Sequence, residues 1–280
     1  MKRYEQGLFV GERALFGSRE VEIVDSVFAD GESPLKESEG VRLENSIFKW
    51  KYPLWYCKNV FAEGCTLLDT ARSGIWYTEN IEMIGCTIDA PKTFRRSRGI
   101  SLSDCTLPRA QETLWSCSDV RLISVSVTGD YFGMNSDGVY AENLDISGNY
   151  AFDGARNVEI RSARLISKDA FWNSENVTVY DSLIVGEYLG WNSKNLRLVN
   201  CTLESDQGLC YAENLVLENC KVINTPLAFE YSTLDAEVTT RIDSVKNPRS
   251  GRIKAKAIGE LIMESECVDT SLTEIITEEK

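Results

Sequence analysis

The sequence predicts an all-β fold, a right-handed parallel β-helix with three sheets, and three observations support this prediction. Aliphatic anchor residues recur every 19 to 21 positions along most of the chain, which is the spacing of a solenoid repeat. The columns two and seven residues after each anchor are apolar throughout. Two other columns hold mostly small residues or cysteine. Because one repeat of this length buries too little apolar surface alone, successive coils must stack on each other.

Each repeat is predicted to carry two strands. Apolar and polar residues alternate around the anchor, as in a β-strand with one buried face, and a second short strand follows a polar corner. Asn and Asp stand at many of these corners, where they tolerate a positive φ. Stacked coils about 4.8 Å apart would pair every strand with the coil above and below. The eleven anchors are Val21, Val41, Val60, Ile81, Ile100, Val120, Val139, Val158, Val177, Leu196 and Leu215.

A leucine-rich repeat is the main alternative fold. Leu196, Leu198, Cys201 and Leu203 fit the core motif of that repeat, and its length range begins near 20 residues. The position three residues before each anchor should then be Leu, but it is always small here. The outer segments also lack the apolar stripe of a helix. Both features favour the β-helix.

The whole chain, residues 1–280, is predicted to form a single domain. Residues 1–17 are expected to cap the N-terminal end, because open strand edges invite aggregation. Regular coils are expected over residues 18–234. Residues 235–280 are expected to form one or two degenerate coils and a polar tail with a short capping helix.

The composition excludes several functions. The chain has no His, so Ser-His-Asp and Cys-His catalysis and His-based metal sites are absent. The net charge of −13 argues against binding to nucleic acid or to an anionic membrane. Seven of the nine cysteines fall in the small columns, where Cys packs as a compact hydrophobe, and no pair has the spacing of a zinc site. We therefore predict reduced thiols and neither a metal nor a cofactor.

No targeting segment stands out in the sequence. The apolar run Leu8-Phe9-Val10 is too short for the core of a signal peptide. No stretch approaches the roughly 18 apolar residues that span a bilayer. We therefore expect a soluble, cytoplasmic protein.

The tryptophans provide the most informative outer column. Five of the six share a register five residues before the anchors, beside an uncharged column that includes Leu54 and Phe94. The Trp column also contains Arg95 and Asp153, so we place it outside. Its indole faces could stack on pyranose rings while Arg and Asn bond the hydroxyls. The candidate residues for binding an oligosaccharide are Trp55, Tyr56, Arg72, Trp76, Tyr77, Arg95, Arg96, Trp115, Trp172 and Trp191.

A structural role is the alternative for this column, in which the tryptophans point inward or are covered by loops or a second subunit. Acids form a weaker pattern nine residues before the anchors, in a row that includes Asp130, Glu187 and Asp206. Such a row could serve glycoside hydrolysis or hold Ca²⁺, but Lys168 interrupts it. One of Arg72, Arg95 and Arg96 could act as the base of a lyase.

Several segments resemble an uncharacterised bacterial family, the domain-of-unknown-function family 3737. They are residues 11–16, 30–37, 51–56, 71–77 and 244–251, so the resemblance covers nearly the whole chain. It implies a β-helix of the pectin-lyase-like superfamily and no established activity, so no catalytic residue is carried over. Most of these segments lie in the first four coils, where we expect any site to be.

The sequence thus leaves three functions open. The first is binding of an oligosaccharide through the outer Trp, Tyr and Arg side chains. The second is a polysaccharide lyase or glycoside hydrolase. The third is a structural module that uses the aromatic face to form homo-oligomers. Whether the protein is an enzyme stays open at this stage.

Overall fold

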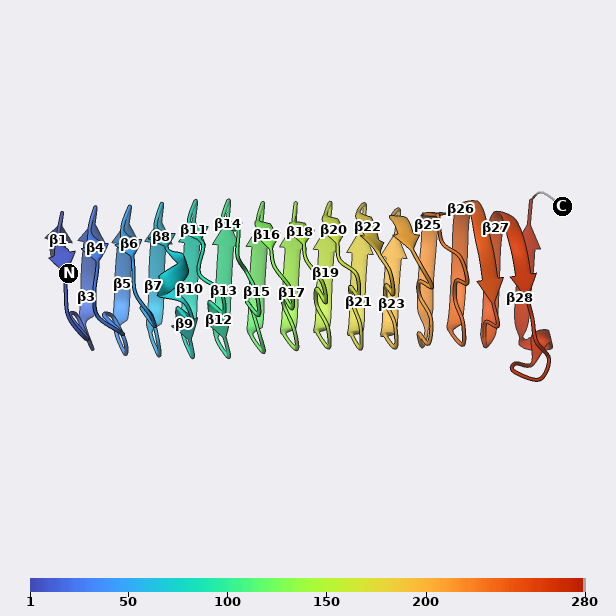
Figure 1. Ribbon diagram of the computed structural model, residues 1–280, viewed down its shortest axis with the longest axis horizontal. Coiled ribbons are helices and arrows are strands. Elements are labelled where there is room, and N and C mark those ends of the chain that lie inside the picture. Colours follow the sequence, from blue (N-terminus) through green and yellow to red (C-terminus); the bar gives the residue numbers. More distant parts are fainter. Residues whose placement is uncertain (279–280) are drawn as a thin grey trace. The chain divides into compact units, whose positions relative to one another are not determined.

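Strands pair in parallel with strands one repeat away in the sequence, as stacked coils require (Figure 1). The computed structural model describes residues 1–278. The chain divides into two compact units, residues 1–140 and residues 141–280, and each is a β-solenoid with almost no helix. The predicted fold class, an all-β parallel solenoid, is confirmed. The single domain stays a prediction.

In residues 1–140, one face of the solenoid is a parallel sheet. Val21 lies opposite Val41, and Val60 lies opposite Ile81, so the pairing follows the predicted anchors. This register is set by the buried pattern, because a shift of one residue would turn every apolar side chain to solvent. The strands are β1 (Lys2–Glu5), β3 (Arg19–Val24), β5 (Glu39–Glu44), β7 (Lys58–Glu63), β10 (Glu79–Ile84), β13 (Arg98–Ser103) and β15 (Ser118–Ile123), with β17 (Asp137–Glu142) starting at the end of the unit.

The second face of residues 1–140 carries shorter strands. They are β2 (Leu8–Phe9), β4 (Val27–Phe28), β6 (Ile47–Phe48), β8 (Thr66–Leu67), β11 (Thr87–Ile88), β14 (Thr106–Leu107) and β16 (Ser126–Thr128). The third side has only one strand pair, β9 (Ile75–Trp76) with β12 (Phe94–Arg95), next to the single-turn helix η1 (Asp69–Ala71). Positive φ angles at Tyr56, Tyr77 and Arg96 end the extended backbone there. The third sheet is therefore shorter than predicted, although amides such as that of Leu54 still donate to the next coil.

Residues 141–280 repeat this arrangement and then change it. The two faces consist of β18 (Asp145–Ser147), β19 (Arg156–Arg161), β20 (Arg164–Ile166), β21 (Glu175–Tyr180), β22 (Leu183–Gly186), β23 (Lys194–Val199), β24 (Thr202–Ser205) and β25 (Leu215–Ile223). Two long strands follow, β26 (Thr233–Lys246) and β27 (Ser250–Ile262), and each continues past a shift of register. The last elements are η2 (Thr270–Leu272) and β28 (Thr273–Thr277), which pairs with β27.

Both ends differ from the prediction. Residues 1–17 were expected to cap the solenoid, but β1 pairs with β3 and β2 pairs with β4, so these residues form a coil of their own. After residue 234, β26 and β27 continue the stacking past shifts of register, as expected for one or two degenerate coils, and β28 adds a further strand. The expected capping helix is only the three-residue η2. Residues 279 and 280 of the predicted polar tail lie outside the described residues.

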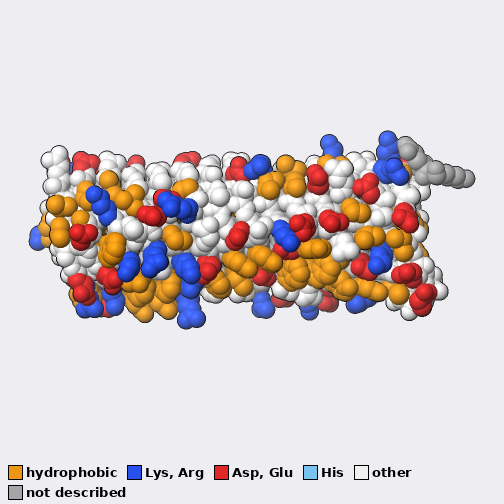
Figure 2. Space-filling model, in the orientation of Figure 1, with side chains coloured by type: hydrophobic (Ala, Val, Ile, Leu, Met, Phe, Trp, Pro, Cys, Tyr) orange, Lys and Arg blue, Asp and Glu red, His pale blue; other side chains and the backbone are white. Residues whose placement is uncertain are grey.

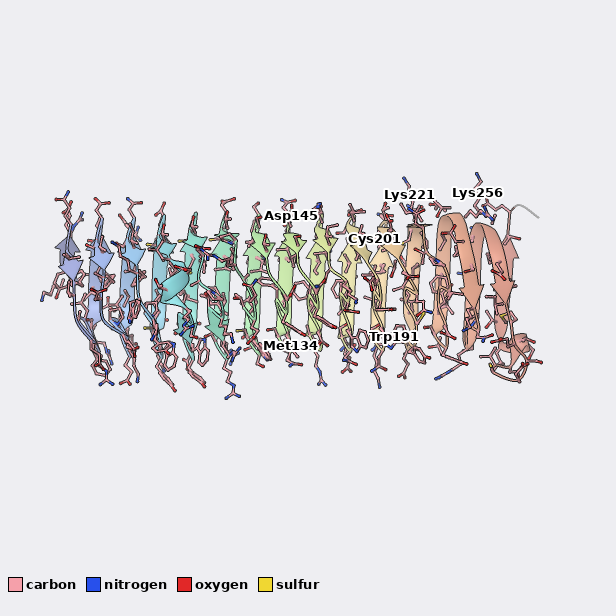
Figure 3. The ribbon with its side chains drawn as sticks, in the orientation of Figure 1. Met134, Asp145, Trp191, Cys201, Lys221 and Lys256 are labelled. Atoms are coloured by element: carbon pink, nitrogen blue, oxygen red, sulfur yellow. The ribbon has the colours of Figure 1, made fainter. Side chains whose placement is uncertain are left out.

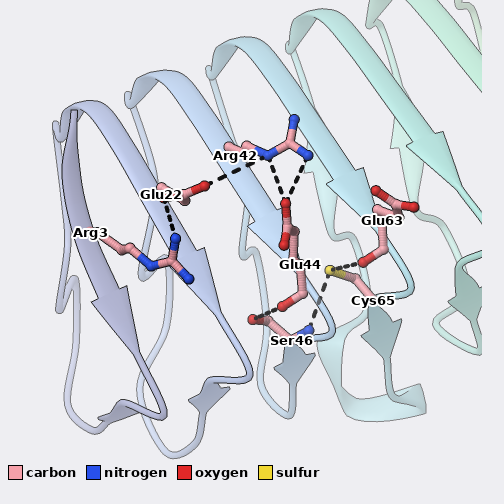
Figure 4. Close-up of polar contacts among 7 residues, drawn as sticks. All are labelled: Arg3, Glu22, Arg42, Glu44, Ser46, Glu63 and Cys65. Atoms are coloured by element: carbon pink, nitrogen blue, oxygen red, sulfur yellow. Dashed lines mark hydrogen bonds and ion pairs between the residues drawn. The ribbon is translucent and has the colours of Figure 1, made fainter.

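The small residues of the repeat satisfy backbone groups at the inner corner (Figure 4). Ser46 Oγ donates to the Glu44 carbonyl at 2.8 Å and accepts from the Ser26 amide at 3.2 Å, one coil away. Cys65 takes the same place in the next coil, where its Sγ accepts from the Ser46 amide at 3.5 Å. A small donor and acceptor is thus needed at each corner, because a buried amide without a partner costs stability.

The predicted role of the cysteines as packing residues is confirmed. Eight of the nine are buried and all nine are free thiols, with only Cys267 exposed. Burial raises the pKa of Cys57 and Cys117 to about 12, which keeps these thiols neutral and unreactive.

Charged side chains lie on the outside of the strands. Arg3 pairs with Glu22 at 3.3 Å and Arg42 with Glu44 at 2.7 Å (Figure 4). Exposed pairs of this kind contribute little to stability. Among residues 1–278, no helix is both long and apolar enough to cross a membrane.

Candidate functional site

The predicted outer residues gather at the turn side of each unit, where coils change direction after the second strand. In residues 1–140 we call this set the N-terminal strip, and in residues 141–280 the C-terminal strip. The N-terminal strip consists of Tyr52, Trp55, Tyr56, Trp76, Tyr77, Arg95, Trp115 and Tyr131. The C-terminal strip consists of Trp172, Tyr188, Trp191, Tyr211 and Tyr231.

The outward direction of the Trp column is confirmed. Leu54, Ile75 and Phe94, each one residue before the column, are completely buried, whereas Trp55 and Trp76 are half-buried. Figure 2 shows hydrophobic side chains along the lower margin of the molecule towards the N-terminal end, with Lys and Arg around them. In Figure 3, Trp191 projects from the turn edge of residues 141–280. Alternation along the strand explains this direction, because neighbouring residues face opposite sides.

The rings of the N-terminal strip stack on each other along the coils. Trp55 and Trp76 are parallel within 9°, with ring centroids 5.1 Å apart. Tyr56 and Tyr77 form a second stack beside them, at 4.8 Å and 9°. The coil spacing is close to the stacking distance of aromatic rings, so one ring in each coil produces a continuous stack. The sequence led us to expect open indole faces for sugar rings, but these faces are covered and mainly ring edges reach solvent.

The two indole nitrogens have structural partners. Trp55 Nε1 donates to the Ser73 carbonyl, and Trp76 Nε1 donates to the Lys92 carbonyl at 2.7 Å. Each bond links one coil to the next. These tryptophans therefore stabilise the turn side, and this supports the structural interpretation for their ring faces.

Arg95 replaces a tryptophan within the stack. Its Cζ lies 4.8 Å from the Trp76 ring centroid and 4.6 Å from that of Trp115, so the guanidinium is held between two indoles. Its Nη2 donates to Glu112 at 2.9 Å, and Lys92 pairs with the same carboxylate at 3.3 Å. Arg95 is thus already bonded within the protein, although its buried Nε has no hydrogen-bond partner.

Arg72 and Arg96 lie at the flanks of the strip and are exposed. Arg96 comes one coil after Tyr77 in the same column. Arg72 lines an open hollow of about 220 Å³ with Trp50 and Lys51. Of the ten arginines in residues 1–140, all within the described part of the chain, only these two make neither an ion pair nor a contact with an aromatic ring.

The C-terminal strip has a similar stack without these cations. Trp172 and Trp191 stack at 5.6 Å and 16°, and Tyr211 follows Trp191 at 4.9 Å. Beside them, Asn192 donates to Asn173 at 2.7 Å, and Asn173 donates to Asp153 at 3.3 Å. Eight of the ten candidate residues therefore belong to residues 1–140, and only Trp172 and Trp191 belong to residues 141–280.

The row of acids forms no metal site in the described residues. Lys168 pairs with Glu187 at 3.2 Å, and exposed pairs of this kind serve mainly as solvated surface. Among residues 1–278, no group of three Cys, Asp or Glu side chains lies close enough to hold a metal ion.

One unusual acid escaped the sequence reasoning. Asp169 is only 1% exposed and its Oδ2 has no hydrogen-bond partner. Burial raises the pKa of Asp169, while Lys168 and a hydrogen bond from Tyr150 lower it. Burial also raises the pKa of Asp153. The sequence does contain a feature that could have identified this acid. In the column eight residues before the anchors, Asp169 stands between Tyr150 and Tyr188 and is the one acid among them.

Residues 2–276 match a single family model, described as a protein of unknown function (DUF3737). No curated protein sequence matches the chain. Among solved structures, the chain is similar to the A-module of the mannuronan C-5 epimerase AlgE4 of Azotobacter vinelandii, with 12% identity over 98% of this chain and 86% of that one and a TM-score of 0.30.

Two further structures are similar at the same low level. The periplasmic alginate epimerase AlgG is 11% identical over 92% of this chain and 76% of its own, with a TM-score of 0.30. PfbA, a surface adhesin of Streptococcus pneumoniae, is 9% identical over 92% and 69%, with a TM-score of 0.25. At these scores no role is carried over to this chain.

Proposed function

We propose that this chain, which belongs to the DUF3737 family of proteins of unknown function, binds an acidic oligosaccharide along the N-terminal strip. One observation supports the proposal most strongly. Arg72 and Arg96 flank the exposed aromatic edges and have no partner within the described protein, whereas the other arginines of residues 1–140 do. Guanidinium groups bind carboxylates with two parallel hydrogen bonds, so a carboxylated sugar is the natural partner.

The surroundings of the strip favour an extended ligand. One hollow lies beside Arg72, and another of about 380 Å³ lies beside Tyr56, where Glu37 and Glu39 line it together with Arg19 and Lys58. Tyr56 is 45% exposed and lines this second hollow. The net charge of −13 repels an anion over a distance, but salt screens that repulsion beyond about 8 Å while the nearby cations act directly.

A binding measurement tests the proposal. The full chain is titrated with oligomers of galacturonate, guluronate and mannuronate in a calorimeter, at two salt concentrations. Loss of one charged hydrogen-bonded contact lowers affinity about tenfold, so the double variant R72Q/R96Q should bind about a hundredfold more weakly. R98Q is the matched control, because Arg98 is exposed and already paired with Asp119 at 2.6 Å. Absence of binding to every acidic oligomer, or an equal loss in the control, would reject the proposal.

A second candidate function is catalysis on such a polymer. It is favoured by Asp153, which lies half-buried in the same column as Trp172 and whose pKa is raised by burial, as a general acid requires. The assay is release of reducing ends or of unsaturated products from uronate polymers, with Asp153→Asn as the comparison. A wild-type chain without either product is not an enzyme of this class.

Two expectations stay predictions. The cytoplasmic location can be checked by fractionation of cells that express the chain. Homo-oligomers that cover the aromatic strips can be checked by light scattering after size exclusion, where a strict monomer would exclude that role for the strips.

A further inference from the structure

A shallow groove crosses the outer face of residues 141–280, away from the C-terminal strip. One hollow of about 400 Å³ lies over β21, β23 and β25. A second hollow of about 310 Å³ lies over β25, β26 and β27. Both are lined by Asn214 and Val216, so together they form one groove across five strands. We call it the amide groove, and its other main lining residues are Asn176, Thr178, Asn195, Arg197, Asp235 and Ser250.

A ladder of asparagines lines the groove. Asn176 donates to Asn157 at 3.2 Å, Asn195 to Asn176 at 2.8 Å and Asn214 to Asn195 at 3.1 Å. A primary amide has two donor hydrogens and two acceptor lone pairs. The ladder uses one of each at Asn176 and at Asn195, so one donor and one acceptor remain on each of these two amides, one coil apart. These remaining groups can bond a ligand in the groove.

The other lining residues of the groove are apolar, polar without charge, or charged and already paired. Thr178 and Val216 contribute methyl groups, and Arg197 contributes its aliphatic stem. The guanidinium of Arg197 makes two bonds of 2.9 Å to Glu218. Asp235 is bonded by Arg252 at 2.9 Å. The groove therefore offers carbon surface and hydrogen-bonding amides but no uncompensated charge, unlike the flanks of the N-terminal strip.

We propose that the amide groove binds a neutral oligosaccharide in an extended conformation. Each sugar hydroxyl is both a donor and an acceptor, which matches the one donor and one acceptor left on each amide. The C–H faces of the rings can cover the methyl groups of Thr178 and Val216. An extended peptide fits less well, because peptides add to a sheet edge, whereas this groove crosses paired strands. This site is separate from the N-terminal strip and does not depend on the function proposed for it.

Residues 1–140 contain a shorter version of the same feature. A hollow of about 380 Å³ lies beside Asn59 and Asn80, whose amides bond at 3.1 Å. The ladder ends there, because Gly99 takes the next position and has no side chain. Glu82 also adds an exposed carboxylate to this hollow. We therefore expect neutral sugars to prefer the amide groove, and the shorter hollow serves as an internal control.

The experiment titrates the full chain with cellohexaose, mannohexaose and xylohexaose, followed by calorimetry and by NMR of labelled asparagine amides. We expect one of the three to bind, and Asn195→Ala to lower its affinity about tenfold because two hydrogen bonds are lost. Asn80→Ala is the matched control and should bind as the wild type does. Thr178→Leu fills part of the groove without adding an aromatic face and leaves the ladder intact, so it should also weaken binding if Asn195→Ala is too unstable to measure.

The two proposed sites are distinguished in the same series. R72Q/R96Q should no longer bind acidic oligomers but should still bind the neutral hexasaccharide. Asn195→Ala should bind acidic oligomers normally and the neutral hexasaccharide more weakly. The amide groove is rejected if none of the three hexasaccharides binds at about 10 mM, where even an interaction of about −3 kcal/mol would be seen. It is also rejected if Asn80→Ala weakens binding as much as Asn195→Ala, or if Thr178→Leu binds normally.

Discussion

The N-terminal and C-terminal strips occupy the same columns of the repeat but differ in charge. In residues 1–140, Arg95 extends the Trp stack as a cation, and Arg72 and Arg96 flank it without partners. In residues 141–280, the corresponding column contains Asp153 before Trp172, and the flanks carry amides bonded to each other. The units contain 16 and 14 basic residues against 20 and 23 acidic ones.

The difference shows how a solenoid separates packing from recognition. Stacking along the column is satisfied by Trp, Tyr or Arg alike, because each side chain contacts mainly its neighbours one coil away. A change of charge at one position therefore alters the surface without altering the fold. The predictions below test this separation, from the largest expected effect to the smallest.

Removal of the central ring of the N-terminal strip should have the largest effect. Trp76 stacks on Trp55, contacts Arg95 and bonds the Lys92 carbonyl, so Trp76→Ala should lower the free energy of unfolding by about 3 kcal/mol. Trp172→Ala should cost only about half as much, because Trp172 stacks on Trp191 alone and its indole nitrogen bonds no described residue. Urea unfolding measures both, and equal losses would contradict the comparison.

Removal of the charged residue from the Trp column should change the free energy of unfolding in opposite directions in the two strips. Arg95→Met loses two cation–π contacts and the bond to Glu112, so the free energy of unfolding should fall by about 1–2 kcal/mol. Asp153→Met removes a carboxylate that is disfavoured by burial, so stability at neutral pH should rise slightly. Thermal unfolding of both variants at pH 7 tests this, and a loss in both would refute it.

Asp169 should make the stability of residues 141–280 depend on pH. Burial raises the pKa of this carboxyl above its ordinary value near 3.8, so the folded state holds the proton more tightly than the unfolded state does. The free energy of unfolding should therefore fall as the pH rises from about 4 through the folded pKa. Asp169→Asn should flatten this slope and stabilise the protein at pH 7.

Unfolding measured at pH 4, 5, 6 and 7 checks the Asp169 prediction. Glu213→Gln is the matched control, because Glu213 is exposed and paired with Lys194 at 3.3 Å, away from Asp169, and it should keep the slope. If the free energy of unfolding of Asp169→Asn depends on pH as that of the wild type does, then Asp169 is charged in the folded protein without loss of stability, and the prediction is wrong.

The smallest effect is expected for charges outside the strips. Arg98 and Asp119 form an exposed pair at 2.6 Å, and such pairs contribute about 0.5 kcal/mol or less. The free energy of unfolding of Arg98→Ala should thus lie within about 0.5 kcal/mol of that of the wild type. The variant should also bind acidic oligomers normally. A larger change would show that surface charge and packing are not separate in this solenoid.

The repeat itself could be predicted from the sequence, because each inner column has a chemical requirement that appears in every coil. Val21, Val41 and Val60 must be apolar to bury one another, and Ser46 and Cys65 must be small to bond a neighbouring amide. The end coils were harder to predict. In β1, Lys2 takes the anchor position, so the apolar signal is lost in that coil.

The sequence by itself thus determined the parallel solenoid and the inner cysteines, which follow from periodicity, and the outward tryptophans, whose column also contains the charged Arg95 and Asp153. The tertiary structure decided what the outer residues offer to a ligand. Whether the Trp76 faces are open, whether Arg72 has a partner and whether Asp169 is bonded depend on distances between side chains in different coils. Such distances follow from the coil spacing and the side-chain rotamers, and a linear pattern contains neither.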